Sequence, residues 1–331
     1  MVLITRRQAF TAIYGNPFRA GFAVAMVRIT HRRCSIHIRQ GGVMSIRTMP
    51  RFRFHVAVVA VAAVVMTVAG QPPASAADNP PFAPYQEMHA NCTVTHRLND
   101  DPIVFPGLAG ASHNHTFIGN PATNANSTTQ SLVGGATSCE DTLDASGYWF
   151  PTLLQNGVVR LPDKPTVYYK SDVKDYRTVR PFPPGFRLVV GDAKMTTATN
   201  FTGEWQCPGY KGKAIPSSCP SGSSLVMRMK APSCWNGVDL DTADHKSHMV
   251  WPINGVCPAS HPVPLPQLQV KLPYPLPGGN TGGLVYSSGN AYSFHYDFMN
   301  GWNDARQVYL VGHCINGGRQ CNGYGVDPHK P

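Results

Sequence analysis

Residues 291–302 read AYSFHYDFMNGW, and the alternation within this stretch indicates the fold class. The even positions from Tyr292 to Phe298 are all aromatic, whereas the odd positions between them are polar and include His295 and Asp297. Such a period of two is typical of a β-strand with one face in the core and the other in solvent. The sequence therefore predicts a half-buried strand whose wet face presents His295 and Asp297 together.

The rest of the chain has the composition of short strands and structured loops. Stretches such as residues 147–151 (GYWFP) and 167–170 (VYYK) are rich in the aromatic and β-branched residues that strands favour. Turn residues are plentiful, with 31 Gly and 30 Pro, and no segment after residue 76 keeps a helical apolar period for three turns. We expect a mostly β fold: a single compact β-sandwich or jelly-roll-like domain with long loops.

The first 76 residues have the features of a leader. They contain ten Arg but no Lys and no acidic residue. Residues 49–54 (MPRFRF) form a basic region, residues 56–69 form an apolar core too short for a ~20-residue membrane span, and residues 74–76 (ASA) fit a signal-peptidase site. We expect residues 1–48 to be an over-extended start, or else an unusually long basic region. Residues 49–76 are then the signal peptide and residues 77–331 the single secreted domain.

The net charge of +10 belongs to this leader. Without its ten Arg, 18 of the 28 basic residues remain against 18 acidic residues, so the predicted mature domain is formally neutral. A neutral domain lacks the basic footprint of a nucleic-acid-binding protein. We therefore expect no nucleic-acid partner. Because the apolar core of the leader is too short for a membrane span, we also expect no transmembrane anchor. We expect the domain to be a monomer.

Eight cysteines follow residue 76, and an even number in a secreted chain indicates disulfide bonds. A zinc site of thiolates is disfavoured because the chain has no CxxC pair. Many pairings are possible. We favour pairing in sequence order, because it closes local loops around turns rich in Pro and Gly. The expected bonds are Cys92–Cys139, Cys207–Cys219, Cys234–Cys257 and Cys314–Cys321.

Two patterns bring imidazoles or an imidazole and a carboxylate to one face of a strand. His113 and His115 lie in the segment GASHNHTFIG, and in an extended chain their i,i+2 spacing suits two ligands of one metal. His295 and Asp297 have the same spacing, and a carboxylate beside an imidazole favours the protonated ring and orients it for acid–base chemistry. The alternative for each pair is a polar, solvated strand face with a purely structural role.

Three further positions are weaker candidates. His245 and His248 in DHKSHM share one face of a helical turn, although an ordinary polar turn has the same pattern. His261 precedes Pro262, where the backbone is extended. Trp302 follows a glycine at the end of the predicted strand, where its indole either stacks on a sugar or packs in the core.

Several motifs together resemble the DUF1996 family of secreted fungal and actinobacterial proteins, over roughly residues 85–315. The family's own function is not established, and the resemblance implies an extracellular domain associated with cell walls and polysaccharides. It also favours one cleft that gathers His113, His115, His245, His248, His261, His295 and Asp297. The matching motifs, in chain order, are MHA (88–90), DPIV (101–104), GASHNHTFIGN (110–120), GYWFPTL (147–153), DHKSHM (244–249), CPASHPV (257–263) and HYDFMNGW (295–302).

Two positions depart from the family pattern. Asn91 stands where a second histidine is common after Met-His-Ala, and Asn303 stands where an aspartate is usual after Gly-Trp. If either position is functional in relatives, this protein is weakened there.

Three hypotheses follow. The first is an enzyme, a hydrolase or lyase of cell-wall polysaccharide, with His113, His115, His295 and Asp297 as catalytic residues and Trp302, Tyr148, Trp149 and His261 at the substrate. The second is a non-catalytic glycan-binding module that uses the aromatic residues alone. The third is a copper or zinc protein whose ligands are His113, His115, His245 and His248 as neutral imidazoles. GxSxG, Walker and HExxH motifs are absent from the sequence, which disfavours the activities that depend on them.

Overall fold

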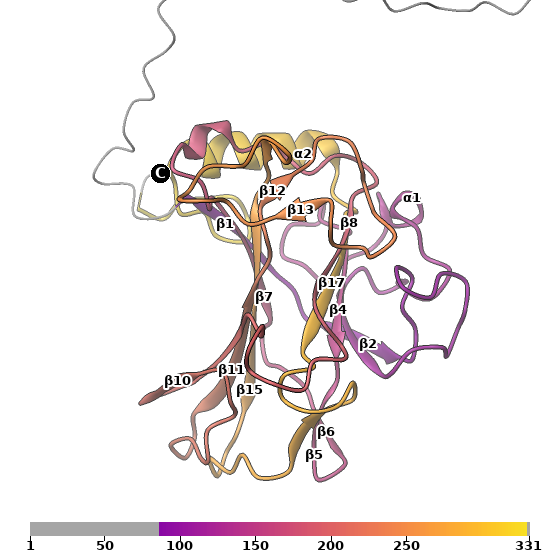
Figure 1. The fold of residues 1–331 in the computed structure, drawn as a ribbon, viewed down its shortest axis with the longest axis vertical. Coiled ribbons are helices and arrows are strands. Elements are labelled where there is room, and N and C mark those ends of the chain that lie inside the picture. Colours follow the sequence, from indigo (N-terminus) through magenta and orange to yellow (C-terminus); the bar gives the residue numbers. More distant parts are fainter. Residues whose placement is uncertain (1–85, 330–331) are drawn as a thin grey trace, which may run out of the picture. The chain divides into compact units, whose positions relative to one another are not determined.

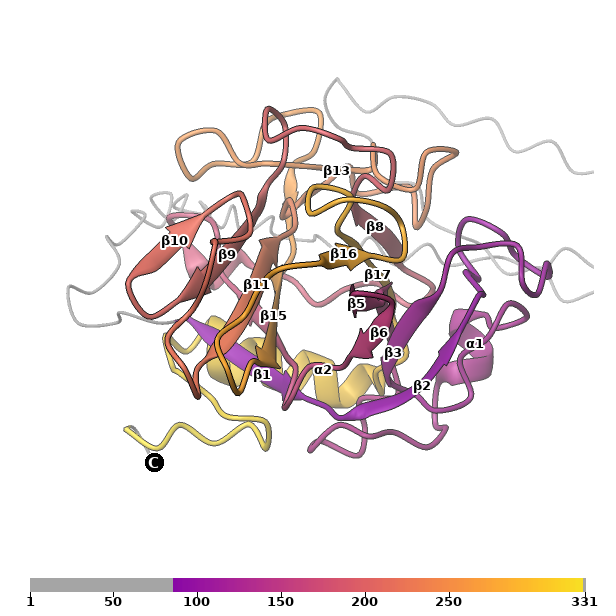
Figure 2. The ribbon, with the colours of Figure 1, turned by 90° about the horizontal axis from the view of Figure 1, so that it is seen from below.

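Two antiparallel sheets pack face to face in the computed structural model, which describes residues 86–329 (Figures 1 and 2). The six-stranded sheet has the order β1 (Glu87–Asn91), β7 (Thr166–Lys170), β15 (Gln267–Pro275), β11 (Ser224–Lys230), β9 (Gly203–Cys207), β10 (Tyr210–Gly212). The five-stranded sheet has the order β2 (Val94–Leu98), β3 (His115–Gly119), β4 (Gly147–Pro151), β17 (His295–Met299), β8 (Arg187–Gly191). The prediction of a mostly β fold is confirmed.

Smaller elements complete this part of the chain. One three-stranded sheet has the order β13 (Met249–Val250), β12 (Cys234–Trp235), β14 (Val263–Pro264), and the other β16 (Leu284–Tyr286), β5 (Leu153–Gln155), β6 (Val158–Arg160). The helical elements are α1 (Thr129–Leu132), the 3-10 turn η1 (Tyr176–Thr178), α2 (Asp304–Leu310) and the π-helical segment η2 (Val311–Ile315). No helix among residues 86–329 is long and apolar enough to cross a bilayer.

The main core lies between the two large sheets. Alternate residues of each strand face it, because side chains along a strand point to opposite sides. The ring of Tyr148 on β4 stacks on Phe298 of β17 at 5.4 Å between centroids. The Tyr296 hydroxyl donates to the carbonyl of Leu268 on β15 at 3.2 Å, which ties the two sheets together.

The five-stranded sheet is covered on its other face as well. The chain between β2 and β4, which includes α1, lies on the side of this sheet away from the six-stranded sheet (Figure 2). A second apolar cluster forms there from Ile103, Phe117, Leu132, Trp149, Val189 and Met299. All five residues of β17 are therefore buried, and the prediction of a half-buried strand with a wet face is wrong. The alternation nevertheless corresponds to two different faces of β17. Tyr296 and Phe298 contact the main core, and the opposite face lies toward the second apolar cluster.

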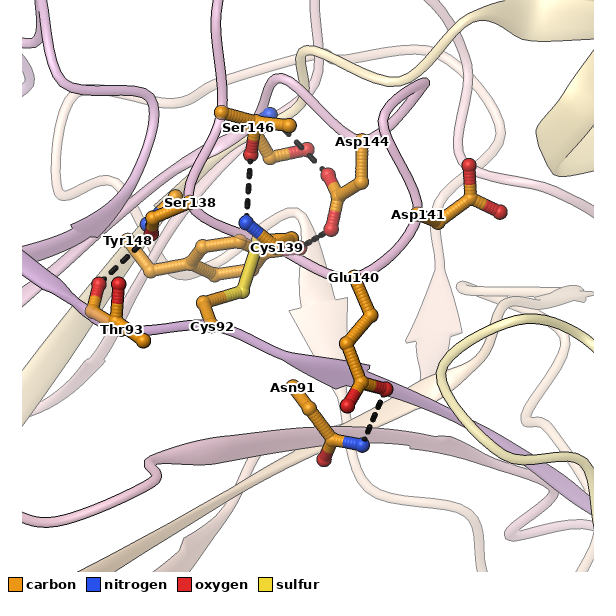
Figure 3. Close-up of a disulfide and its surroundings, with 12 residues drawn as sticks. Asn91, Cys92, Thr93, Ser138, Cys139, Glu140, Asp141, Asp144, Ser146 and Tyr148 are labelled. Atoms are coloured by element: carbon orange, nitrogen blue, oxygen red, sulfur yellow. Dashed lines mark hydrogen bonds between the residues drawn. A yellow bond between two sulfur atoms is a disulfide. The ribbon is translucent and has the colours of Figure 1, made fainter.

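All four disulfides join cysteines in sequence order, as predicted. The Cys92–Cys139 bond fastens the junction between β1 and β2 to the chain before β4 (Figure 3). Beside it, the Ser138 hydroxyl donates to the carbonyl of Thr93 at 2.7 Å. The expected extension 1–48 and signal peptide 49–76 lie outside the described residues and stay predictions.

Candidate functional site

The strand pairing of the five-stranded sheet brings together histidines that are far apart in the sequence. Phe117 of β3 lies opposite Trp149 of β4, and Trp149 lies opposite Asp297 of β17. His115 and His295 are each two residues before this row, on strands that run in the same direction because both pair antiparallel with β4. Their side chains thus lie on the same face of the sheet, under the loop that precedes β3.

His113, in that loop, completes a group of three imidazoles. One ring nitrogen from each of His113, His115 and His295 lies within 4.8 Å of the others. The Nε2 atoms of His115 and His295 are 3.3 Å apart, and the ring centroids of His113 and His115 are 4.2 Å apart. We call His113, His115, His295 and the neighbouring Asp297 the histidine centre.

The backbone fixes the tautomers of two of these rings. The Nδ1 atom of His115 is 2.9 Å from the carbonyl oxygen of Asp100, and the Nδ1 atom of His295 is 2.9 Å from the carbonyl oxygen of Ser293. A carbonyl oxygen only accepts, so each Nδ1 carries the proton and donates. Both Nε2 atoms consequently carry lone pairs, which face each other and cannot form a hydrogen bond. The Nε2 atom of His113 is buried too, with no partner among residues 86–329.

Two carboxyl groups lie beside the rings. Both oxygens of Asp297 are buried, and neither has a hydrogen-bond partner in the described part of the chain. Asp101 is bonded to the backbone, with its Oδ1 accepting from the amides of Ile103 and Val104 at 3.0 and 2.9 Å. Ligand atoms of Asp101, His115 and Asp297 again lie within 4.8 Å of one another. The two groups of three possible ligands thus share His115.

Burial sets the protonation of the centre. Desolvation lowers the pKa of His113 to about 4 and that of His295 to about 3, and it lowers the pKa of His115 well below its usual value. The three rings are therefore neutral at pH 7. Burial, reinforced by the charge of Asp101, raises the pKa of Asp297 well above its usual value, against a smaller opposing effect of Lys246. A bound cation would favour the neutral rings and the ionised carboxylate.

A cavity of about 690 Å³ connects the centre to solvent. Its lining includes the half-buried His113 and the buried His295 and Asp297 of the centre, together with the exposed side chains of Lys194 and Asp244. The cavity thus has room for a small molecule beside His113 and His295.

The DHKSHM segment forms another wall of this cavity. It lies along the free edge of β8, where the amide of Val189 donates to the carbonyl of His245 at 3.0 Å. His245 has a φ of +58°, and its Nδ1 lies 2.8 Å from the carboxylate of Asp241. Lys246 lines the cavity and donates to the carbonyl of Gly191 at 2.6 Å. This segment covers a sheet edge and positions a cation near the centre.

The structure brings together four of the predicted site residues: His113, His115, His295 and Asp297. His245 lines the same cavity but has its carboxylate partner outside the centre. His248 and His261 do not join them, so the expectation of one cleft for all seven groups is wrong. His248 is buried, with its Nε2 at 2.9 Å from the carbonyl of Arg187, and His261 binds the carbonyl of Ser247 at 2.9 Å. Both histidines hold the turn that carries the DHKSHM segment.

The aromatic residues expected to contact a substrate are in the core. Trp302, Tyr148 and Trp149 have exposed fractions of 2%, 1% and 0%, so none presents a face to a sugar. The indole Nε1 of Trp302 donates to the hydroxyl of Tyr169 at 3.0 Å, which is the usual arrangement of a buried Trp. The cause is the covering of the five-stranded sheet on both faces, which a strand pattern alone does not indicate.

The proposed pairing of His295 with Asp297 also differs from the structure. The two residues share a face, but the carbonyl of Ser293 rather than the carboxylate orients the ring. Sequence reasoning missed Asp101 and Lys246 as members of the site. The signal available for Asp101 was its position at the start of the DPIV motif, residues 101–104.

Neither departure from the family pattern affects the cavity. Asn91 lies near the disulfide, and its side-chain amide donates to the carboxylate of Glu140 at 2.9 Å (Figure 3). Asn303 caps α2, where its side chain accepts from the amide of Arg306 at 3.0 Å. An aspartate would cap this helix equally well.

Comparison with known proteins gives one match. A family model described as "Domain of unknown function (DUF1996)" matches residues 101–302, a range that contains the whole histidine centre and Asp101. No curated protein and no solved structure matches the chain.

Proposed function

The chain belongs to the DUF1996 family, and we propose that its function depends on a divalent transition metal held by His113, His115 and His295. The observation that carries this proposal is the pair of facing Nε2 atoms, 3.3 Å apart, on rings whose Nδ1 atoms are both committed to carbonyls. Such carbonyl partners are typical of histidines that ligate a metal. Imidazole ligands suit zinc and copper, so these are the expected ions.

Asp297 is proposed as the fourth protein group of the site. Its carboxylate has no other partner in the described residues, and one of its oxygens lies within 4.8 Å of a ring nitrogen of His115, so it would be placed to bind a metal or to accept a proton from a water beside it. The cavity side of the centre leaves room for that water and for a substrate. Catalytic zinc sites use three protein ligands, such as three imidazoles, and leave a fourth position for water, whose pKa is then about 7.

We therefore propose a metal-dependent hydrolase or lyase that acts outside the cell. Four disulfides support an oxidising compartment, and polysaccharides of cell walls are the substrates that the family resemblance suggests. In this scheme His113, His115 and His295 bind the metal and are not general bases. Lys246 is placed to contact an anionic group of the substrate or of an intermediate.

The test is metal content of protein purified without a histidine tag and dialysed against zinc or copper. We expect about one ion per chain in the wild type, and less than about a tenth of that in His115→Ala and His295→Ala, because two ligands or fewer hold a metal poorly. His261→Ala is the matched control, since it removes an imidazole outside the cavity and should keep the full metal content. Wild-type protein that elutes free of both metals would overturn the proposal.

A further inference from the structure

The outer face of the six-stranded sheet carries a group of cations that the histidine centre does not involve. On β11, Leu225, Met227 and Met229 face the core, so Arg228 and Lys230 point to the opposite side. On this side Arg228 is half-buried and Lys230 is exposed, whereas Thr166, Gln267 and Gln269 of the neighbouring strands are buried. Lys271 on β15 shares the same side. We call Arg228, Lys230 and Lys271 the cationic face.

The pairing within this group opposes like charges. Arg228 lies directly opposite Lys271 in the register of β11 and β15, and like charges in such a position are unfavourable, although Glu204 lies opposite Arg228 on β9. Among residues 86–329, no carboxylate lies within 4 Å of these side chains. Other lysines on this side do have such partners: Lys170 pairs with Glu87 at 2.8 Å and Lys211 with Glu204 at 3.2 Å.

The cations belong to a polar row that crosses five strands. The register places Glu204, Arg228, Lys271, Thr166 and Asn91 side by side on β9, β11, β15, β7 and β1. A hollow of about 600 Å³ lies at the Asn91 end, beside the disulfide of Figure 3, and one of about 330 Å³ lies at the Glu204 end. Carboxylates line both hollows, Glu140 and Asp163 at the first and Glu204 at the second, so the positive charge is concentrated at Lys271 and Arg228 between them.

The chemistry of the row points to one kind of ligand. The amide oxygen of Gln206 accepts from Arg228 Nε at 3.1 Å and so orients the guanidinium, whose planar fork matches a carboxylate. Neighbouring strands are about 4.8 Å apart, a spacing comparable to the length of one pyranose ring in a linear chain. Three unpaired cations on a formally neutral domain are too few for nucleic acid, which is bound through many phosphate contacts.

We propose that the cationic face binds a linear polysaccharide that carries a carboxylate on its sugar rings, lying across β11 and β15. Arg228 and Lys271 contact successive carboxylates, and Lys230 contacts the edge of the polymer. The face lies on the outer side of one sheet and the histidine centre on the outer side of the other, with the core between them. Binding therefore does not require the metal, and either proposal can fail alone.

The experiment is affinity electrophoresis of the intact protein in gels that contain polygalacturonate, its fully methyl-esterified form or a neutral glucan. We expect retardation by polygalacturonate alone, reduced by added salt because exposed charges are screened. Arg228→Gln combined with Lys271→Gln should weaken the binding by about tenfold or more, because two charge-assisted contacts are lost.

Arg97→Gln combined with Lys174→Gln is the matched control, because it removes two exposed positive charges from other surfaces and should leave the affinity unchanged. Thermal unfolding of both double variants establishes that each is folded. Equal binding by the Arg228/Lys271 variant and the wild type would overturn the proposal. Equal retardation by the esterified polymer, or tighter binding to inorganic polyphosphate or single-stranded DNA, would also overturn it.

Discussion

Asp297 shows how one side chain can oppose the stability of the fold and serve a ligand. Its carboxyl is fully buried, has no hydrogen-bond partner in the described residues and lies beside three neutral imidazoles. A group of this kind is expensive to keep in a folded protein unless something pairs with it. In the proposed function, that partner is the metal.

Replacement of Asp297 by Asn is therefore expected to have opposite effects with and without metal. Burial raises the pKa of Asp297 in the folded protein, so folding favours the protonated carboxyl. This group therefore contributes stability at low pH, and the contribution is lost as the pH rises through the folded-state pKa. At pH 7 the metal-free Asn variant should be more stable than the wild type, by about 1.4 kcal/mol per unit of pKa elevation. Urea unfolding measures this difference. Metal titration should show at least about tenfold weaker binding, and unchanged metal affinity would remove Asp297 from the site.

At the scale of elements, the sequence predicted the strands and the disulfide pairing, but not which other segments of the chain pack against each strand. The alternation in residues 291–302 correctly predicted a strand that presents His295 and Asp297 on one side. Sequence-order pairing of the cysteines was correct because each bond closes a local loop. The covering of β17 on both faces could not be predicted, since the covering loop lies far away in the sequence and has no periodic pattern.

The loop sizes of two disulfides lead to a prediction on stability. Cys92–Cys139 closes a separation of 47 residues and Cys314–Cys321 one of 7. Because a longer closed loop restricts the unfolded chain more, paired Cys→Ala replacement should lower the free energy of unfolding by about 4 kcal/mol for the first bond and about 2 kcal/mol for the second. Urea unfolding of the two double variants should preserve this order. The reverse order would show that native contacts around the bonds dominate.

The cap of α2 offers a smaller and sharper test. Asn303 accepts a hydrogen bond from the Arg306 amide at 3.0 Å, so Asn303→Ala should destabilise the protein by about 1 kcal/mol. Asn303→Asp restores the residue usual in the family and should be neutral or slightly stabilising, because a carboxylate also caps and interacts well with a helix N-terminus. Thermal unfolding of both variants measures the effect. A loss of metal binding in either variant would contradict a purely structural role.

At the scale of the whole molecule, the site depends on the order of strands in a sheet. His115 and His295 are 180 positions apart and meet only because β4 lies between their strands. No local pattern predicts that strand order. The sequence therefore indicated the pairs His113/His115 and His295/Asp297, but not that the two pairs lie side by side. The family resemblance supplied that expectation. It was right for His113, His115, His295 and Asp297, and His245 lines the same cavity with Asp241 as its partner. It was wrong for His248 and His261, which bind backbone carbonyls elsewhere.

The protonation of the centre predicts how stability depends on pH. The pKa of His295 is about 3 in the folded protein and near 6.5 in the unfolded chain, so its contribution is complete above pH 6.5 and is lost as the pH falls toward 3. Within this window one such histidine changes the free energy of unfolding by about 1.4 kcal/mol per pH unit. Metal-free His295→Gln should lack this component. Urea unfolding at pH 5.5 and 4.5 compares the two slopes, and identical slopes would show that the ring is not desolvated.

The 180 positions between His115 and His295 also set a time order during biosynthesis. A nascent chain that has not yet emerged past β17 can offer His113 and His115 but lacks the third imidazole and the carboxylate. Tight capture of the proposed metal must then wait until β17, the last strand of this sheet in chain order, is inserted between β4 and β8. In a chain exported before it folds, this order leaves the choice of metal to the compartment in which folding finishes, and not to the one in which translation takes place.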